Sequence, residues 1–487
     1  MILKNLIYGI ESKIHGITEI EITGLSYDSR NIEKGYVFFA LNGVHADGAK
    51  FAKDAVQKGA VCVISDKKIE DLSCTNIVVT NTSAAMAEIS AKFYDYPDKK
   101  MTVIGVTGTN GKTSITYMTE SLFKSKGIEI GVIGTISYRY AGKIIDAPNT
   151  TPQSLDLYRM MSEMAAADIK YLIMEVSSHS LVLGRVNGIE FDIAAWTNLT
   201  PDHLDFHKDM NTYFEAKSML FSSLSNNLKK NTKYAIINID DDYGKKLFEQ
   251  NIKAEKISYS AKSSDASISA SEIELKKTDS SFMLKTLYGN KFINVHHIGL
   301  HNVYNILAVT GICLAAGLKF DNVAELIENT APAPGRFEKI VSKKGFTVII
   351  DYAHTDDALK NVLSAIKNLN PARIITVFGC GGNRDKTKRP IMAKTACTMS
   401  DFVFITSDNP REEDPVKITE EVEAGAREIN KTNYKTIIDR RSAIEEAVKY
   451  AGKNDIVLLA GKGHEKYQII GTTKFHFDDR EEVMKLI

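Results

Sequence analysis

The chain has 487 residues, of which 44% are hydrophobic and 25% charged, the balance of an ordinary folded globular protein. Lysine plus arginine and aspartate plus glutamate number 61 each, so the formal net charge is zero. General nucleic-acid binders and membrane-surface proteins carry a basic excess, and we therefore expect neither kind of partner. At roughly 100–200 residues per domain, the length predicts about three domains.

Five cysteines are scattered without a CxxC pair, which excludes a zinc site or a disulfide framework of the usual spacing. We expect core thiols in a reducing compartment. The first residues lack the long apolar stretch of a signal peptide, and no run of about 18 apolar residues occurs in the sequence. These observations predict a cytoplasmic protein.

Short strands and helices alternate over the first hundred residues. The expected elements are a strand at 37–41, a helix at 51–58, strands at 60–65 and 76–80, and a helix at 84–93. The segment YDYPDKK (94–100) has a proline and several charges, as linkers do. We therefore predict a first α/β domain over residues 1–98.

Near-continuous apolar strands alternate with helices from Met101 onwards. The expected strands lie at 101–106, 130–135, 171–178, 191–199 and 234–240. This pattern predicts a mostly parallel sheet with helices on both faces. Alternating residues near 265–297 indicate antiparallel strands, and a helix is expected over 302–316. Because NTAPAPGR (329–336) is a predicted second linker, the central domain is predicted at 99–333.

A third alternating series predicts a Rossmann-like α/β domain at 334–487. Its expected strands, each ending in polar or glycine residues, lie at 346–354, 373–382, 401–410, 434–440 and 455–464. Ligands of open α/β sheets bind beyond the carboxyl ends of the strands, so these polar ends are the natural site candidates.

The strongest single motif is GVTGTNGKTS (105–114), which lies between a predicted strand and a helix expected near Thr113. Glycines let the backbone approach phosphates, backbone N–H groups bind the anion, and the helix N-terminus favours negative charge. The general pattern has glycine where this chain has Val106. We still expect ATP or GTP binding, with Lys112 reaching the β/γ-phosphates and the Thr113 hydroxyl binding Mg²⁺. The expected loop residues are Gly108, Thr109, Asn110, Gly111, Lys112, Thr113 and Ser114.

TGTNGKTS (107–114) resembles the phosphate loop of the Mur ligase family, cytosolic ATP-dependent enzymes that add amino acids to the peptidoglycan precursor. Further motifs follow in the family's order: MEVSSH (174–179), NLTPDHLDFH (198–207), YFEAKSMLF (213–221), HNVYN (301–305), PGRFE (334–338), DYAH (351–354), GCGGNRDKTKRP (379–390), SDNPRE (407–412) and GKGHE (461–465). YDSR (27–30) and GVHADG (43–48) resemble a UDP-substrate domain. The resemblance implies three domains, for the acceptor nucleotide, ATP and an amino acid.

The activity that the resemblance implies is amide formation in peptidoglycan synthesis, which cell shape and cell division require. Meso-diaminopimelate would be added to the D-Glu γ-carboxylate of UDP-N-acetylmuramoyl-L-Ala-D-Glu. The carboxylate first attacks the γ-phosphate of ATP, and the amine then displaces phosphate from the acyl phosphate. Such phosphoryl transfer needs positioning and charge neutralisation more than covalent help from the protein.

The resemblance also implies the catalytic and metal-binding residues. Lys112 is expected to act on the phosphates, while Mg²⁺ is expected at Thr113, Glu175, His203 and a Lys217 that carries a carbamate from CO₂. Taken alone, these residues have simpler interpretations: a solvated strand cap, a structural histidine and a surface lysine. His207 and His179 are weaker candidates. Nucleotide contacts from the far side are implied for Asn302, Arg336 and Asp351.

The UDP-linked acceptor has its own implied set: Ser29, His45, Ala46, Thr150, Thr151, Ser177 and Arg185. Arg185 could pair with a carboxylate of the substrate peptide, because guanidinium binds carboxylates through two parallel bonds. Leu183 stands where relatives often have glutamine, which removes one polar contact. Asp356 replaces a proline of the family's DYAHTPD, at a helix start where aspartate is favourable.

The implied amino-acid site centres on SDNPRE, where Arg411 follows a proline-fixed turn. In the family, DNPR marks enzymes that add meso-diaminopimelate, whose distal carboxylate this arginine receives; lysine lacks that carboxylate. The simpler interpretation of Arg411 is a solvated residue beside two glutamates. The implied set is Arg384, Asp408, Asn409, Pro410, Arg411, Gly461 and Glu465, in which Glu465 could accept the ammonium group.

Three alternatives stay open on the sequence. The same ligase could use L-lysine or another diamine. A folylpolyglutamate synthetase would lack the substantial first domain, and a P-loop switch or motor would need no GKGHE site. We expect a monomer that binds UDP-N-acetylmuramoyl-L-Ala-D-Glu, diaminopimelate, ATP and Mg²⁺, with neither nucleic acid nor membrane as partner.

Overall fold

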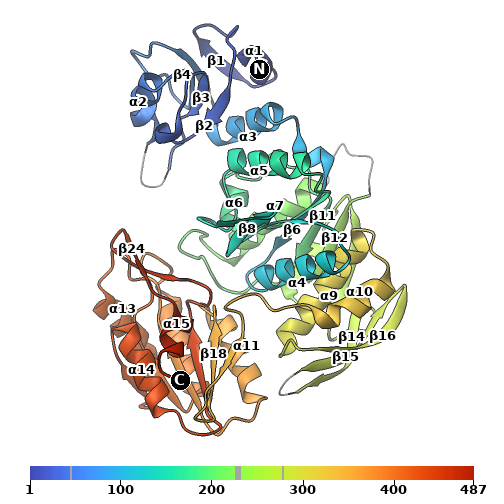
Figure 1. Ribbon diagram of the computed structural model, residues 1–487, viewed down its shortest axis with the longest axis vertical. Coiled ribbons are helices and arrows are strands. Elements are labelled where there is room, and N and C mark those ends of the chain that lie inside the picture. Colours follow the sequence, from blue (N-terminus) through green and yellow to red (C-terminus); the bar gives the residue numbers. More distant parts are fainter. Residues whose placement is uncertain (44–46, 225–231, 277–278) are drawn as a thin grey trace. The chain divides into compact units, whose positions relative to one another are not determined.

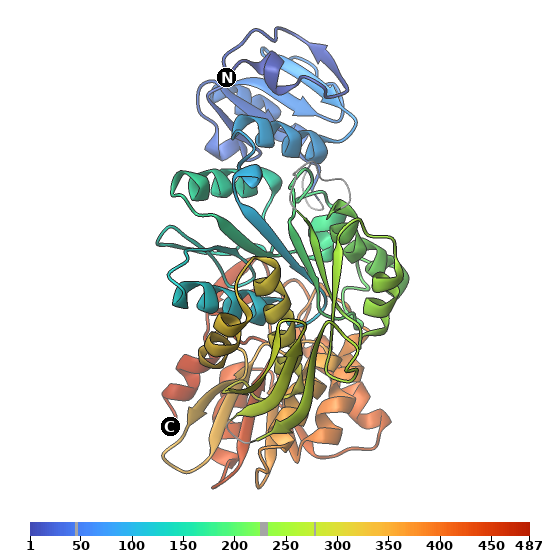
Figure 2. The same ribbon diagram turned by 90° about the vertical axis from the view of Figure 1, so that its right-hand side faces the viewer.

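The structure is a computed structural model that describes residues 1–43, 47–224, 232–276 and 279–487 (Figures 1 and 2). The chain divides into two compact units. One consists of Met1–Gly105, Glu129–Asp192 and Met219–Lys233, and the other of Val106–Ile128, Ile193–Ser218 and Tyr234–Ile487. Because the boundary falls inside strand β6 (Thr102–Thr107), this strand belongs to both units.

The first unit begins with a sheet in the strand order β1-β5-β4-β3-β2 (blue in Figure 1). Its elements are α1 (Leu3–Leu6), β1 (Ser12–His15), β2 (Gly24–Ser26), β3 (Tyr36–Phe39), α2 (Ala52–Gln57), β4 (Ala60–Ser65), β5 (Thr75–Val79) and α3 (Thr82–Phe93). The pairs are parallel except β1 with β5. Alternate strand residues point to opposite faces, so Val37 and Phe39 pack with α1 and α3, whereas Phe38 packs with α2.

The first unit continues along the strand order β6-β10-β7-β8-β9. The elements are β7 (Gly131–Ile133), β8 (Ser137–Tyr140), β9 (Lys143–Asp146), α5 (Ser154–Ala166), β10 (Tyr171–Glu175) and α6 (Ser178–Val182). Strand β10 is parallel to β7, while β7, β8 and β9 form an antiparallel meander. Residues 172–174 are fully buried, so both faces of β10 are covered and Glu175 lies at its carboxyl end.

The second unit holds the strand order β16-β15-β14-β13-β12-β11-β6. Its elements are α4 (Lys112–Ser125), β11 (Ile193–Trp196), β12 (Tyr234–Asn238), α8 (Asp242–Glu249), β13 (Glu255–Ser260), β14 (Ile268–Leu275), β15 (Ser280–Thr286), β16 (Gly289–Val295), α9 (Leu300–Ala315) and α10 (Phe320–Leu326). Strands β11 to β14 are parallel, and β14 to β16 are antiparallel, as the sequence predicts. Helix α9 packs on α4 and on β12 to β14.

The last part of the second unit is a sheet in the order β17-β18-β22-β19-β20-β21, parallel except for β17 (orange to red in Figure 1). The elements are β17 (Glu338–Val341), β18 (Thr347–Asp351), α11 (Asp356–Lys367), β19 (Ile374–Phe378), α12 (Lys388–Met399), β20 (Phe402–Ile405), α13 (Pro415–Glu428), β21 (Tyr434–Thr436), α14 (Arg440–Tyr450), β22 (Ile456–Ala460), β23 (Tyr467–Ile470), β24 (Thr473–His476) and α15 (Asp479–Met484). One face packs against α11, α12 and α13, and the other against α14 and α15.

The structure confirms the α/β fold class with mostly parallel sheets. Several strands are shorter than predicted. For example, β10 ends at Glu175 because Ser177 caps α6, accepting the N–H of Ser180. The two compact units do not follow the predicted domain boundaries, which stay a prediction. All five cysteines are free; Cys74 is half-buried and the others are buried.

No helix in the described ranges has the length and apolar character needed to cross a membrane.

A buried ion pair joins α14 to α15. Arg440 donates from Nε and Nη2 to the two carboxylate oxygens of Asp479, at 2.8 and 2.6 Å, and both side chains are fully buried. We expect Asp479→Ala to lower the free energy of unfolding by about 3–5 kcal/mol, because an unpaired guanidinium would stay buried. Urea denaturation measures this loss. Glu19→Ala removes the exposed Lys4–Glu19 pair and should lower the free energy of unfolding far less, because solvent screens exposed charges; equal losses in the two variants would contradict this assignment.

Candidate functional site

The loop between β6 and α4 depends on two glycines in left-handed backbone conformations. Gly108 and Gly111 have φ angles of +141° and +90°. A Cβ at Gly108 would lie 1.8 Å from Thr197 Oγ1, and one at Gly111 would lie 2.6 Å from Asn305 Oδ1. Asn198 accepts the N–H groups of the two residues after Gly108, through its carbonyl and its side chain. The segment after β11 therefore shapes the predicted phosphate loop.

Two lysines meet at the carbonyl oxygen of Gly108. Lys112 Nζ lies 2.7 Å from this oxygen, and Lys217 Nζ, from α7 (Met210–Leu224), lies 2.9 Å from it. Lys217 is buried, with Nζ 4.7 Å from the centre of the Tyr213 ring. Burial, together with the Lys112 cation, holds the pKa of Lys217 well below its usual range, although Asp202 opposes this. An amine with a lowered pKa is nucleophilic near neutral pH.

Asp202 is a buried carboxylate that the sequence analysis did not single out. His203 Nε2, Lys388 Nζ and His354 Nε2 lie 3.4, 3.6 and 3.9 Å from its oxygens. Burial raises the pKa of Asp202, but these groups outweigh it and hold the pKa below the usual range. The pair Asp–His in NLTPDHLDFH was the available signal. Lys388 and His354 are distant in sequence, so the cluster depends on the fold.

The weaker candidate His207 stacks on the Tyr213 ring, with centroids 4.9 Å apart. Burial and the nearby Lys217 lower its pKa. His207 is thus held among the residues beside the phosphate loop, in the packed arrangement of a structural histidine.

Of the residues expected to contact the nucleotide from the far side, Arg336 and Asn302 lie beside the phosphate loop. Arg336 Nη2 donates to Thr113 Oγ1 at 3.3 Å. Asp351 accepts two backbone N–H groups; burial raises its pKa, against the opposing charge of Arg336. Asn302 Oδ1 accepts a 3.1 Å hydrogen bond from Asn305, the side chain next to the second loop glycine. A guanidinium beside the loop adds a positive charge where phosphate binding is predicted.

Glu175 lies in the first unit, at the end of β10. Thr135 donates to its carboxylate from both N and Oγ1, at 2.9 Å each, and Thr150 Oγ1 lies 3.1 Å from Thr135 Oγ1. Thr151 Oγ1 donates to the Glu175 carbonyl at 2.9 Å. The predicted metal ligand and two predicted acceptor-binding threonines therefore form one network.

Arg185 of the first unit is held by its neighbour Thr151, whose carbonyl accepts from Nη1 at 3.0 Å. Its Nε is buried and has no hydrogen-bond partner in the described part of the chain, and burial lowers its pKa. Such a guanidinium suits a carboxylate ligand. Ser177 N donates to Thr151 Oγ1 at 3.1 Å. Ser29 is buried at the start of a short 3₁₀ helix, and residues 45–46 lie outside the described residues.

The four predicted metal-binding residues are divided between the units, with Glu175 in the first and Thr113, His203 and Lys217 in the second. In the ranges that the structure describes, no three His, Cys, Asp or Glu side chains form a group that could hold a metal ion. The predicted set is of another kind, because it includes a hydroxyl and a modified lysine. Metal binding by these residues stays a prediction.

The structure brings together most of the predicted amino-acid site at the carboxyl end of the last sheet. Arg411 has a φ of +51° and donates from Nη1 to Gly382 O at 2.8 Å. Asn409 Nδ2 donates to Glu465 Oε2 at 2.8 Å. Burial and the nearby Arg384 cation lower the pKa of Arg411. A Cβ at Gly381 would lie 3.0 Å from Arg411 Nη1 and 3.8 Å from Arg384 Cγ, so both cationic side chains pass this glycine. An anion would relieve this repulsion.

Gly461 brings β22 close to the DNPR turn. It has a φ of +111°, and a Cβ would lie 2.8 Å from Asp408 Oδ2. Asp408, Asn409 and Pro410 are all buried, so the turn before Arg411 is packed rather than solvated. This placement argues against the simpler interpretation of Arg411 as a solvated residue.

Arg389, which the motifs did not single out, is a fully buried cation beside this turn. Its guanidinium donates to both carboxylate oxygens of Glu413, at 3.0 Å each, and to Gly381 O at 3.2 Å. Arg389 thus ties the glycine turn after β19 to the turn that carries Arg411. Its place in GGNRDKTKRP was the only sequence signal.

The Arg389–Glu413 pair predicts a pH dependence of stability. Arg389 lowers the pKa of Glu413 to about 2, against the effect of burial. Because the folded pKa lies below the ordinary value, stability is present above about pH 4.5 and is lost as the pH falls toward 2. We expect Glu413→Gln to lose less stability than wild type between pH 5 and 3 in thermal unfolding. An equal loss in both proteins would contradict the assignment.

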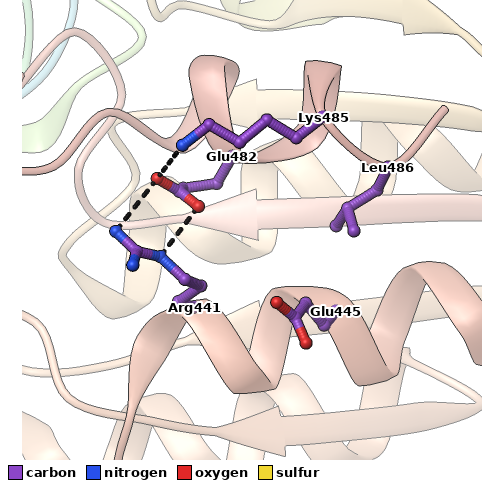
Figure 3. Close-up of a pocket in the computed structure, with 5 residues that line it drawn as sticks. All are labelled: Arg441, Glu445, Glu482, Lys485 and Leu486. Atoms are coloured by element: carbon purple, nitrogen blue, oxygen red, sulfur yellow. Dashed lines mark hydrogen bonds and ion pairs between the residues drawn. The ribbon is translucent and has the colours of Figure 1, made fainter.

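A separate pocket lies between α14 and α15 and is lined by Arg441, Glu445, Glu482, Lys485 and Leu486 (Figure 3). Glu482 pairs with Arg441 at 2.9 Å and with Lys485 at 2.9 Å. None of these residues belongs to the predicted site. The Arg441–Glu482 pair links α14 to α15, and the Glu482–Lys485 pair lies at the end of α15.

Three family models match successive parts of the chain: Mur ligase family, catalytic domain, at residues 21–94; Mur ligase middle domain at 106–313; and Mur ligase, glutamate ligase domain, at 335–463. A UDP-N-acetylmuramoyl-L-alanyl-D-glutamate–2,6-diaminopimelate ligase from Fusobacterium nucleatum is 44% identical over 485 residues, covering 98% of this chain and 96% of its own length. The chain belongs to the Mur ligase family.

Two solved Mur ligases share its fold. A UDP-N-acetylmuramoyl-L-alanyl-D-glutamate–2,6-diaminopimelate ligase has a TM-score of 0.69 at 31% identity, over 100% of this chain and 98% of that one. MurF from Thermotoga maritima, solved in complex with ADP, has a TM-score of 0.64 at 17% identity, over 90% and 93%. These findings confirm the predicted family and a ligase as the class of enzyme, and the interpretation as a switch or motor is wrong. Mur ligases use ATP.

Proposed function

We propose that this Mur ligase adds meso-diaminopimelate to the D-Glu γ-carboxylate of UDP-N-acetylmuramoyl-L-Ala-D-Glu, at the expense of ATP. This is the activity of the MurE type, in cytoplasmic peptidoglycan precursor synthesis, and we propose that the protein acts as a monomer. The observation that carries the proposal is the buried DNPR turn, which fixes the guanidinium of Arg411 on Gly382 O, with the Arg384 side chain nearby at Gly381. The names of the relatives support the same substrate.

The proposed reaction has two steps. A carboxylate oxygen of the acceptor attacks the γ-phosphorus of ATP and ADP leaves; the amine nitrogen then attacks the acyl carbon, inorganic phosphate leaves, and the amine loses a proton. The chain's part is to bind and orient. Backbone N–H groups of residues 108–113 and the cation of Lys112 would hold the phosphates, and Arg336 would add charge from beside Thr113.

Lys217 is proposed to carry a carbamate. Its amine has a lowered pKa and can attack CO₂, forming an N–C bond and releasing one proton. The neighbouring Lys112 cation would stabilise the anion that results. Thr113, Glu175, His203 and the carbamate would then hold Mg²⁺, which supplies charge neutralisation at the transferring phosphoryl group when bound.

The choice of diaminopimelate over lysine is proposed to rest on charge. Diaminopimelate carries one carboxylate more than lysine, and this carboxylate would neutralise the neighbouring cations of Arg384 and Arg411. Lysine would leave them unpaired. Glu465, next to Asn409, would accept an ammonium group of the incoming amino acid.

Phosphate release measured with ATP and Mg²⁺ tests the proposal. We expect turnover only when both UDP-N-acetylmuramoyl-L-Ala-D-Glu and an amino acid are present, with diaminopimelate preferred over lysine. Mass spectrometry of the product identifies the amino acid that was added. A preference for lysine would favour the alternative diamine ligase.

A further inference from the structure

Lys462 is a fully buried lysine beside the proposed amino-acid site that the sequence analysis assigned no role. It lies between Gly461 and Gly463, whose φ angles are +111° and +52°. A Cβ at Gly463 would lie 2.7 Å from both the Gly335 carbonyl oxygen and the Tyr352 Cβ. The backbone on either side of Lys462 is therefore closely packed.

The Lys462 ammonium group joins two side chains of the site. Its Nζ lies 3.2 Å from Asn409 Oδ1 and 3.3 Å from Glu465 Oε2. Asn409 Oδ1 also accepts the N–H of Ile469 at 2.9 Å, so the Nδ2 of that amide points to Glu465 Oε2. Glu465 Oε2 thus has two donors, whereas Oε1 has no hydrogen-bond partner among the described residues.

The surroundings of Glu465 disfavour its ionised form, and a nearby cation offsets this effect. Burial and the Asp408 carboxylate raise the pKa of Glu465, and Lys462 opposes them. A protonated Glu465 could not pair with an ammonium group. The other charged or titratable groups whose fields reach Glu465 are Arg411, Arg440, Tyr352 and Tyr467.

We propose that Lys462 is a positioning residue for the incoming amino acid: it fixes Oε2 of Glu465 and the amide of Asn409, and so presents Oε1 of Glu465 to an ammonium group. This inference rests on the proposed function of Glu465. In this proposal Lys462 does not touch the substrate. It sets the orientation and the charge of Glu465, which does.

Lys462→Met keeps the length of the side chain and removes the charge. We expect the KM for diaminopimelate to rise about 10- to 100-fold, while the KM for ATP changes less than about threefold. In the variant this KM should fall as the pH is raised from 6 to 9, because Glu465 regains its charge; a loss of packing alone would give no such profile. Lys462→Arg should restore part of the affinity.

Lys233→Met is the matched control, since Lys233 is a buried lysine paired with Asp192 outside the proposed site. It should lower the thermal unfolding temperature without raising the KM for diaminopimelate. Glu465→Gln provides a second measurement. If Lys462 acts through Glu465, Lys462→Met in the Glu465→Gln background should raise KM further by less than about threefold.

The outcomes separate the two proposals. A wild type that does not ligate diaminopimelate would overturn the proposed function. A wild type that does, together with an unchanged KM in Lys462→Met or with full additivity of the two substitutions, would overturn the role of Lys462. Should Lys462→Met fail to fold, Lys462→Arg decides: a KM for diaminopimelate within about tenfold of wild type supports the inference, and a larger increase that is the same at every pH contradicts it.

Discussion

Lys217→Ala is expected to lower the rate of ligation by about a thousandfold or more, with little change in ATP binding by the phosphate loop. The reason is the proposed carbamate, an anion that this lysine makes from its unprotonated amine. Lys217 is buried, and burial and Lys112 together lower its pKa. Removing a group that stabilises charge in the transition state typically costs about 10²–10³ in rate, and loss of a metal ligand adds to this.

Chemical rescue distinguishes the carbamate from a purely structural lysine. Bicarbonate or another short carboxylic acid should partly restore the activity of Lys217→Ala, because a small anion can occupy the space that the side chain leaves. Lys126→Ala is the control, since Lys126 is exposed and donates to Asn322 Oδ1, away from the phosphate loop. It should keep wild-type activity. Full activity of Lys217→Ala without an added acid would contradict the proposal.

Arg411→Ala is expected to lower kcat/KM for diaminopimelate by about 10²–10³ and to leave the low activity with lysine nearly unchanged. Without the Arg411 guanidinium, the distal carboxylate of diaminopimelate would lose the partner that binds it. Lysine has no such carboxylate, so its binding would not depend on Arg411. The preference for diaminopimelate should therefore nearly vanish. Steady-state kinetics with both amino acids measures this change.

Arg441→Ala serves as the matched control for Arg411→Ala. Arg441 belongs to the same sheet domain but lines the separate pocket with Glu482 and Lys485 (Figure 3). Its removal should leave the preference unchanged. If Arg411→Ala and Arg441→Ala had equal effects, or if wild type preferred lysine, the role of Arg411 would be wrong.

Much of the fold was accessible from hydrophobic pattern. Buried parallel strands such as β10 and β22 appear as continuous apolar runs because helices cover both faces. Strand ends were less predictable. Strand β10 ends where it does because Ser177 caps the next helix. This cap depends on a hydrogen bond from the N–H of Ser180, which the hydrophobic pattern does not show.

The ordered motifs identified the predicted site residues. They did not reveal which neighbouring side chains hold those residues in place. Arg389 and Lys462 each stand inside a motif, yet only burial and their hydrogen bonds distinguish them from solvated cations. Asp202 acquires its environment from Lys388 and His354, which belong to remote parts of the chain. Local spacing carries no information about such long-range neighbours.

The opening balance of 61 cationic against 61 anionic residues excluded a general affinity for polyanions, and the motifs then identified a ligase of the Mur family. Those properties follow from composition and local pattern, because glycine spacing and strand–helix alternation are written in consecutive residues. Where positive charge gathers is a property of the folded chain. Lys112 and Lys217 converge on Gly108 because α4 and α7 each place a lysine at the phosphate loop. Arg384 lies near Arg411 because the segments that follow the paired strands β19 and β20 meet at one edge of the sheet.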